Sequence, residues 1–179
     1  MKDRDLSKLL SLVLRHQPEF IGVELDKNGW VSVDSLLEKL QKKAPGTDLE
    51  RLKQIVLNND KQRFSFNDEL TEIRANQGHS VTVDLDLKAV TPPEFLYHGT
   101  VENVMDSIRK EGLTKRSRQH VHLSKDLETA VKVGSRRGKP VILTIRSEVM
   151  AQAGYSFFCS ENGVWLCDAV PAEFIDFTI

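Results

Sequence analysis

Arginine and histidine side chains recur in this sequence at places where predicted helices and strands end. Arg15 and His16 are adjacent at the end of the first apolar segment, and Arg118 stands two residues before His120. A guanidinium group offers a planar fork of donors that matches a phosphate, and a nearby histidine can exchange a proton near neutral pH. The pattern indicates an anion site. An Arg-His pair at a helix end has a simpler alternative interpretation, compensation of the helix dipole.

A second polar segment surrounds Gly78. Arg74, Gln77 and His79 flank this glycine, and Arg63 precedes the same predicted hairpin. A glycine in such a loop allows the backbone to approach a ligand together with the polar side chains. The alternative is an ordinary surface turn, so the segment by itself indicates only a candidate support for a bound phosphate.

Nucleotide binding is suggested by two glycine-containing segments. His98, Gly99 and Thr100 follow a predicted strand, and their side chains can hydrogen-bond ribose hydroxyls or an amide. Gly134 and Arg137 lie in a basic segment that suits either a pyrophosphate or a solvated turn. The chain has no G-x-G-x-x-G fingerprint after a strand and no Walker A motif, so a bound nucleotide would require another architecture.

His120 and His122 have the H-x-H spacing of some metal ligands, and both lie on one face of a predicted strand. No third and fourth ligand follows at a suitable spacing. Cys159 and Cys167 fit buried strand positions better than ligand positions. We therefore expect an anion site here and no metal.

The composition is that of an ordinary globular protein. The 179 residues include 40% hydrophobic and 28% charged residues, with a formal net charge of -1. The absence of a long apolar run, the charged start and the presence of only two cysteines predict a cytoplasmic protein with no membrane contact. Basic residues gather in two stretches that suit phosphate binding or a solvated face. These residues are Arg109, Lys110, Lys115, Arg116 and Arg118, then Lys132, Arg136, Arg137 and Lys139.

The elements that position these residues are predicted to change character along the chain. Apolar periodicity predicts helices around 6–15, 36–40 and 49–56, then hairpin strands at 64–66 and 70–73, and a strand at 81–85. Ser35 with Glu38, and Thr47 with Glu50, have capping-box spacing. Three helices followed by a hairpin are the order of a winged-helix module.

The second half is predicted to be richer in strands. A proline pair near residue 92 indicates a boundary, which gives domains 1–90 and 91–179. Strands are expected at 95–97, 120–123, 141–146, 155–159, 164–167 and 174–179, and helices at 101–110, 127–133 and 148–151. The fold class is therefore α+β, with antiparallel strand pairs.

Six segments, taken in order, resemble the NAD-dependent RNA (tRNA) 2′-phosphotransferase family over essentially the whole chain. The segments are Leu14–Pro18, Lys61–Phe64, Ile73–Ser80, Leu96–Thr100, His120–Ser124 and Asn162–Leu166. The resemblance implies a winged-helix N-terminal lobe that binds the RNA phosphate. It also implies an ADP-ribosyltransferase-like C-terminal lobe that binds NAD, with a mixed, largely antiparallel sheet.

The resemblance also implies roles for individual residues. The catalytic set would be Arg15, His16, Arg63 and Arg118. Contacts to NAD would come from His98, Gly99, Thr100, His122, Leu123, Ser124, Gly134, Arg137 and Val164, and support for the RNA phosphate from Arg74, Gln77 and His79. Val164 stands where many ADP-ribosyltransferases have a catalytic glutamate. The choice of Arg118 over Arg116 depends on its spacing from His122.

The implied reaction moves an internal 2′-phosphate, as left at tRNA splice junctions, from RNA to NAD. The products would be nicotinamide and ADP-ribose 1″,2″-cyclic phosphate, formed through a 2′-phospho-ADP-ribosylated RNA. NAD would be a co-substrate, no metal would be needed, and no obligate protein partner is indicated. The alternatives are an ADP-ribosyltransferase that caps terminal phosphates of RNA or DNA, an NAD hydrolase, and a non-catalytic RNA-binding protein.

Overall fold

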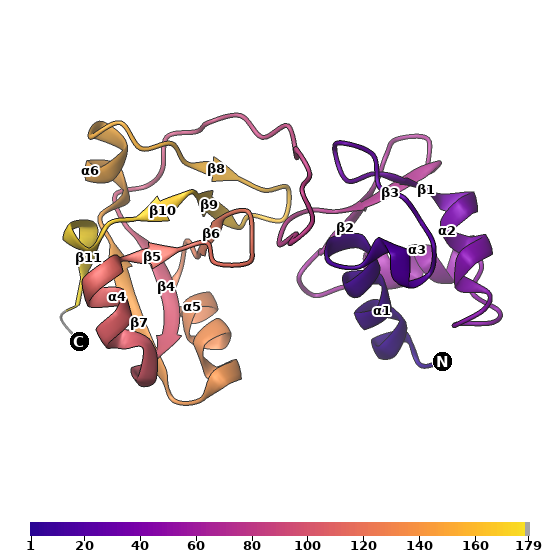
Figure 1. Ribbon diagram of the computed structural model, residues 1–179, viewed down its shortest axis with the longest axis horizontal. Helices are drawn as coiled ribbons and strands as arrows, with labels where there is room; N and C mark the ends of the chain where they lie inside the picture. The colour runs from indigo at the N-terminus through magenta and orange to yellow at the C-terminus, as the bar shows by residue number, and fades with distance from the viewer. Residues whose placement is uncertain (178–179) are drawn as a thin grey trace. The chain divides into compact units, whose positions relative to one another are not determined.

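The chain divides into two compact units, each with its own hydrophobic core (Figure 1). The computed structural model describes residues 1–177, and the units are Met1–Asp86 and Leu87–Ile179. The division falls slightly before residue 90, the end of the first domain predicted from the proline pair. Within the described part of the chain, no helix is long and apolar enough to cross a bilayer.

Three helices form most of the first core. They are α1 (Asp3–Arg15), α2 (Val33–Leu40) and α3 (Leu49–Leu57), with a short 3-10 turn, η1 (Pro18–Phe20), after the first. The apolar stripe of α1 is fully buried, because Leu6, Leu10, Val13 and Leu14 all have 0% exposure. The three helices predicted for this half are confirmed.

The N-caps of α2 and α3 differ from the predicted capping boxes. The Ser32 hydroxyl accepts from the Ser35 backbone N–H at 3.4 Å, so the cap lies before Ser35. The Asp48 carboxylate accepts from the backbone N–H of Arg51 at 2.8 Å, so the cap lies after Thr47. The predicted caps are wrong because a better placed oxygen is available one turn or one residue away.

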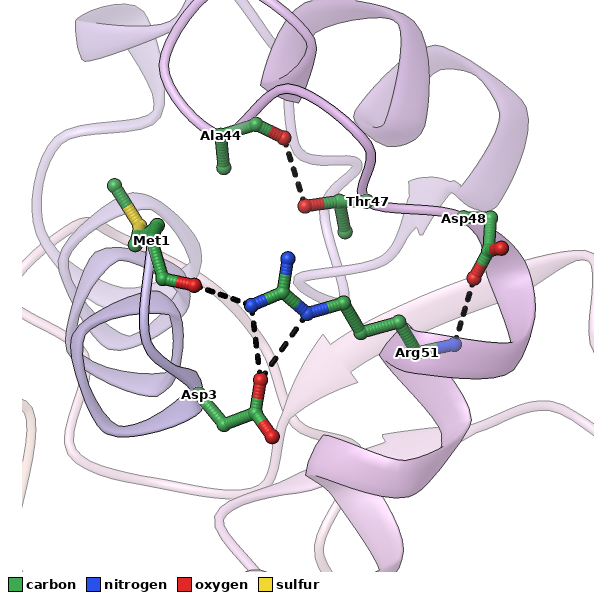
Figure 2. Close-up of polar contacts among 6 residues, drawn as sticks. All are labelled: Met1, Asp3, Ala44, Thr47, Asp48 and Arg51. Carbon is green, nitrogen blue, oxygen red and sulfur yellow. Dashed lines mark hydrogen bonds and ion pairs between the residues drawn. The ribbon is translucent and has the colours of Figure 1, made fainter.

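Arg51 fastens the start of α1 to the first turn of α3 (Figure 2). Its Nε and NH2 atoms donate to the Asp3 carboxylate at 3.1 and 2.9 Å, and NH2 also donates to the Met1 carbonyl. Close by, the Thr47 hydroxyl donates to the Ala44 carbonyl at 2.8 Å. These contacts fix the N-terminal end of α1, whose C-terminal end carries candidate site residues.

A small antiparallel sheet completes the first unit. Its strands are β1 (Val31–Ser32), β2 (Phe64–Phe66) and β3 (Glu72–Ala75), in the order β1-β3-β2. The predicted hairpin is confirmed, with Phe64 opposite Ala75. Its second strand begins later than predicted, because the Asn67 carboxamide oxygen accepts from Thr71 N and Glu72 N and extends the turn.

The strand predicted at 81–85 is wrong, since these residues form no strand. Val83 and Leu85 are nevertheless 8% and 7% exposed, which explains why their alternation resembles a strand pattern. The backbone N–H of Asp84 donates to the carbonyl of Lys27 at 2.7 Å. The segment is therefore held by the turn that contains Lys27 and not by a sheet.

The described part of the second unit contains three antiparallel sheets. The strands of the first are β4 (Leu96–Val101), β7 (Pro140–Ile145) and β11 (Ile175–Asp176), in the order β11-β7-β4. Those of the second are β6 (Val121–Leu123), β8 (Phe158–Cys159) and β9 (Trp165–Cys167), in the order β6-β9-β8. The third pairs β5 (Leu113–Thr114) with β10 (Ala169–Val170).

All six strands predicted for this half exist, although most are shorter than predicted. The predicted strand 174–179 corresponds to β11, and residues 178 and 179 lie outside the described part of the chain. The pair β5 and β10 was not predicted, because two-residue strands leave no alternation to detect. Helices and antiparallel sheets in both units confirm the α+β class.

Helices and 3-10 turns flank these sheets. They are α4 (Met105–Glu111), α5 (Leu127–Gly134) and α6 (Ser147–Gln152), with turns η2 (Glu102–Val104), η3 (Ser135–Arg137) and η4 (Ala172–Phe174). The predicted helix 101–110 begins later, because Val101 is still the last residue of β4. Figure 1 shows α5 beside β4, where it positions the residues of a candidate nucleotide site.

Candidate functional site

The end of α1 is joined to the polar loop that follows β3. The Arg15 carbonyl accepts from the backbone N–H groups of Ser80 at 2.9 Å and Val81 at 3.3 Å. His16 Nδ1 lies 2.9 Å from the Ser80 hydroxyl oxygen in a hydrogen bond. Gly78, with φ of 86°, allows the left-handed turn that brings this loop back to the helix. Two segments that looked like separate surface features in the sequence therefore form one cluster.

His79 lies inside this cluster and is only 1% exposed. Burial, followed by the positive charges of Arg15, His16 and Arg74, lowers its pKa from 6.5 to about 4. Neither ring nitrogen has a hydrogen-bond partner within residues 1–177. His79 is therefore neutral at physiological pH, and its support of a bound phosphate stays a prediction.

Arg74 and Gln77 are the other residues predicted to support the phosphate. The Arg74 guanidinium carbon lies 4.5 Å from the centre of the Trp30 ring, in a cation–π contact. This contact fixes the direction of Arg74 beside the buried His79. Gln77 is half-buried in the loop itself. The structure thus brings Arg74 and His79 close to Arg15 at the end of α1, and Gln77 lies in the same loop as His79.

Arg63 is held by a residue that sequence reasoning missed. The Asn59 carboxamide oxygen accepts from Arg63 N at 3.2 Å and from Arg63 NH1 at 3.2 Å. The Asn59 amide nitrogen donates to the Ser7 hydroxyl of α1 at 3.2 Å. Behind this contact, the Arg63 carbonyl accepts from Asn76 N at 2.9 Å, at the start of the polar loop. An asparagine after a helix usually indicates only a cap, so its spacing gave no signal of this role.

His98, Arg118 and His122 form a linked set in the second unit. His98 Nδ1 donates to the His122 carbonyl at 3.0 Å. Burial lowers the pKa of His98, the hydrogen bond to His122 opposes this shift, and the charges of Arg137 and Arg118 lower the pKa again. His98 is therefore a neutral imidazole whose Nε2 atom is a hydrogen-bond acceptor.

His122 has the opposite arrangement of its ring protons. Arg118 NH1 donates to His122 Nδ1 at 3.1 Å, so the neutral ring carries its proton on Nε2 and is a donor there. The two histidines thus offer an acceptor and a donor, from His98 and His122 respectively. Neighbouring ribose hydroxyls, which both donate and accept, match such a pair.

Gly99 and Gly134 let α5 lie directly against β4. A Cβ atom on Gly99 would stand 1.9 Å from the Ala130 carbonyl oxygen, and one on Gly134 would stand 2.9 Å from Pro140 Cβ. The packing of α5 against β4 therefore explains why both positions are glycines. This packing also brings Arg137, which follows α5 in η3, close enough to His98 to lower its pKa.

The remaining predicted nucleotide contacts differ in what they can offer. Leu123 is 2% exposed and belongs to the core, so its side chain is unavailable to a ligand. Ser124 exchanges backbone hydrogen bonds with Tyr97 at 2.7 and 2.8 Å, which joins the end of β6 to β4. Thr100 is half-buried on β4, and half-buried Val164 follows the turn that joins β8 to β9.

No group of three or more potential metal ligands occurs among the described histidine, cysteine and acidic residues. The His120 ring instead packs against Phe158, with ring centres 6.0 Å apart. Cys159 and Cys167 lie on β8 and β9 as strand residues, and burial followed by the charge of Asp168 raises the pKa of Cys167 to about 12. The strand positions of both cysteines are confirmed, but only Cys167 is buried, whereas Cys159 is half-buried.

Several residues of the two basic stretches are paired with acids. The pairs are Arg109–Asp106 at 3.5 Å, Lys115–Asp168 at 2.7 Å and Lys132–Glu128 at 2.6 Å. Exposed pairs of this kind reduce the local positive potential. The solvated-face interpretation therefore fits these three residues, whereas Arg118 contacts a histidine of the linked set.

Comparison with known proteins points to one family. A family model described as "RNA 2′-phosphotransferase, Tpt1 / KptA family" matches residues 1–169. A "Probable RNA 2′-phosphotransferase" of Flavobacterium johnsoniae is 59% identical over 97% of this chain and 96% of its own length. Proteins of the same name from Fusobacterium nucleatum and Burkholderia pseudomallei are 52% and 54% identical, covering 98% and 96% of this chain and 98% and 93% of their own lengths.

Proposed function

The chain belongs to the Tpt1 / KptA family of RNA 2′-phosphotransferases, and we propose that it removes an internal 2′-phosphate from RNA by transferring it to NAD. The main observation in favour of phosphotransfer is the family match, which spans residues 1–169. The observation that supports NAD as the acceptor is the linked set of His98, His122 and Arg118. The proposed physiological substrate is the splice-junction type of 2′-phosphate in tRNA.

The proposal assigns a different task to each unit. Met1–Asp86, with three helices and a β-hairpin, would be the winged-helix lobe that binds the phosphate. Leu87–Ile179, with its antiparallel sheets, would be the ADP-ribosyltransferase-like lobe that binds NAD. The reaction then needs side chains from both units.

In the first step, an oxygen of the RNA 2′-phosphate attacks C1″ of the nicotinamide ribose. The C1″–nitrogen bond breaks, and nicotinamide leaves with the bonding electron pair. The ribose would be oriented by His98 as acceptor and His122 as donor, because their tautomers are set by the hydrogen bonds that each ring already makes. The product of this step is a 2′-phospho-ADP-ribosylated RNA.

This step requires no general base, because the attacking phosphate is already an anion. By the family resemblance, Val164 would occupy the position at which many ADP-ribosyltransferases have a glutamate that activates a neutral nucleophile. A carboxylate there would repel the phosphate. What the reaction needs is a positively charged environment that aligns the phosphate with C1″.

In the second step, O2″ of the same ribose attacks the phosphorus atom. The bond from phosphorus to the RNA O2′ breaks, and the proton lost by O2″ is matched by the proton gained at O2′. Arg15, Arg63 and Arg118 would neutralise the charge that spreads over the phosphate oxygens. His16, held to Ser80 by a 2.9 Å hydrogen bond, would orient the phosphate and protonate the departing O2′.

The proposal is tested by mixing the protein with NAD and a short RNA that carries one internal 2′-phosphate. A matched RNA with the same sequence and a terminal phosphate is the control. Nicotinamide, the mass of the RNA and the nucleotide product are followed together. The expected result is loss of the internal phosphate with one nicotinamide and one ADP-ribose 1″,2″-cyclic phosphate formed per RNA.

Other outcomes would identify another reaction. ADP-ribose attached stably to the terminal phosphate, with the internal phosphate untouched, would overturn phosphotransfer in favour of capping. Hydrolysis of NAD without any change in either RNA would identify the protein as an NAD hydrolase. RNA binding with no consumption of NAD would remove the enzymatic proposal altogether.

A further inference from the structure

The proposed catalytic Arg63 is held by one asparagine that contacts it at two points. The carboxamide oxygen of Asn59 accepts from the backbone N–H and from the NH1 group of Arg63, both at 3.2 Å. It also accepts from Lys61 N at 3.3 Å, and Asn59 is only 9% exposed. A single buried oxygen therefore defines both where the backbone of Arg63 lies and where its guanidinium group points.

This contact restricts a side chain that is otherwise flexible. An arginine side chain loses substantial rotamer entropy when it is fixed, so a guanidinium held before the substrate binds has less entropy to lose in the reaction. The acceptor is also a neutral amide. It orients the guanidinium of Arg63 without cancelling the positive charge that a phosphate needs.

Asn59 also connects Arg63 to α1. Its amide nitrogen donates to the Ser7 hydroxyl at 3.2 Å. Ser7 lies on the same helix as Arg15, about two turns earlier, and a helix transmits position rigidly over that length. The contact thus relates Arg63 to the helix whose C-terminal end carries Arg15 and His16.

We propose that Asn59 is a positioning residue, which orients the Arg63 guanidinium toward the 2′-phosphate while leaving its charge intact. The inference rests on the proposed function, since it assumes that Arg63 acts on the phosphate. Asn59 itself makes no contact with the reacting atoms in this proposal. Its effect on the rate is exerted through Arg63.

The first variant, Asn59→Ala, removes the contact with Arg63, and a control variant changes the neighbouring Asn58. In Asn59→Ala, the second step should slow by roughly tenfold to a hundredfold, because a misplaced catalytic group costs rates of that order. The ADP-ribosylated RNA should accumulate, while the KM for NAD should stay unchanged. Asn58→Ala is the control, because the side chain of exposed Asn58 has, within residues 1–177, a hydrogen bond only to Gln54, at 3.4 Å.

The second variant separates the charge of the side chain from its shape. Asn59→Asp keeps the oxygen that accepts from Arg63 but adds a negative charge beside the guanidinium. The folded state should stay close to the wild type in stability, because the stronger contact of a charged acceptor with Arg63 offsets the burial of the carboxylate and the loss of the amide donor to Ser7. The second step should nevertheless slow by roughly tenfold or more, since the charge of Arg63 is then shared with the aspartate. A purely structural role for Asn59 predicts unchanged kinetics in a variant that is equally stable.

The decisive experiment is a double-mutant cycle in single-turnover assays of the full chain, with melting temperatures measured alongside. Arg63→Ala, Asn59→Ala and the double variant are compared for the rate of each step. If Asn59 acts through Arg63, Asn59→Ala should change the second step by less than about twofold when Arg63 is already alanine. An equal further loss in that background would overturn the inference, as would full activity of Asn59→Asp.

Failure of the inference can be distinguished from failure of the proposed function. A wild-type protein that forms no ADP-ribose cyclic phosphate refutes the function before any variant is made. A normal second step in Arg63→Ala refutes the role of Arg63, and the inference about Asn59 with it. If Arg63→Ala stalls and the cycle is additive, the function stands and only the inference about Asn59 is wrong.

Discussion

The histidines of this protein differ because their hydrogen bonds and surroundings differ. His98 is neutral and offers an acceptor, His122 offers a donor, and His79 is buried next to positive charge. Their sequence contexts do not show these differences, because each is a histidine near a glycine or an arginine. The roles proposed for them therefore come from contacts and can be tested separately.

Loss of the His98 acceptor should weaken the binding of NAD more than it slows the reaction. In His98→Ala, we expect the KM for NAD to rise by about tenfold, because one hydrogen bond of about 1.4 kcal/mol is lost. The KM for RNA should change less. Steady-state kinetics with each substrate varied in turn measures both values. His120→Ala is the control, since its ring packs on Phe158, and an equal effect there would contradict the assignment.

His79 should make the protein sensitive to acid. Its pKa is lowered from 6.5 to about 4 in the folded protein, so the unfolded chain binds its proton more tightly. The contribution of neutral His79 to the free energy of unfolding is fully present above pH 6.5. Roughly 3 kcal/mol of it is lost as the pH falls toward 4. Urea unfolding of wild type and His79→Leu across this range measures it. A pH dependence that is the same in both proteins would show that the loss arises elsewhere.

At the scale of elements, packing explains residues whose sequence context suggested ligand binding. Gly99 and Gly134 stand in segments that suit a nucleotide, yet their Cβ positions are filled by the facing backbone and by Pro140. The α5 helix therefore contributes indirectly, by carrying η3 and Arg137 to the neighbourhood of His98. Predicted contacts of these glycines with NAD remain a proposal.

Gly99→Ala should destabilise the protein, because the new Cβ would stand 1.9 Å from the Ala130 carbonyl oxygen. Overpacking of this kind costs typically about 1–3 kcal/mol, and the shift of α5 should also raise the KM for NAD. Thermal unfolding and kinetics of the same preparation measure both effects. Gly154→Ala is the control, because its Cβ would have open space and only its φ of 100° is unfavourable. A loss of stability in Gly99→Ala no larger than that in Gly154→Ala would contradict the packing argument, because only Gly154 has a positive φ.

At the scale of the whole molecule, the proposed chemistry draws on both units. Arg15 belongs to Met1–Asp86 and Arg118 to Leu87–Ile179. If both neutralise the same phosphate in the second step, their contributions to its rate are coupled. Both arginines lie within residues 1–169, over which the family model matches.

A cycle of Arg15→Ala, Arg118→Ala and the double variant tests this coupling. Each single variant should slow the second step by roughly a hundredfold or more, and the double variant should lose much less than the product of the two. Rapid-quench measurements of the RNA intermediate and final product provide the rates. Independent, fully multiplicative effects would contradict action on one phosphate.

The sequence by itself determined the α+β class, the order of the long elements and the family. Periodic apolar residues are local signals, so the buried face of α1 and the hairpin of β2 and β3 could be predicted directly. The six motifs indicate the family because all of them occur in this chain in the same order. Helix caps and two-residue strands such as β5 were missed, because neighbouring oxygens or distant partners decide them.

Only the tertiary structure decided which residues meet and in what protonation state. Asn59 gave no signal in the sequence, yet its oxygen holds Arg63 and its amide reaches Ser7, which is 52 residues earlier in the chain. His79 became a buried neutral group because burial and three nearby basic residues lower its pKa. Hydrogen bonds and electrostatic interactions depend on distance in space, and folding brings together groups that the sequence separates by tens of residues.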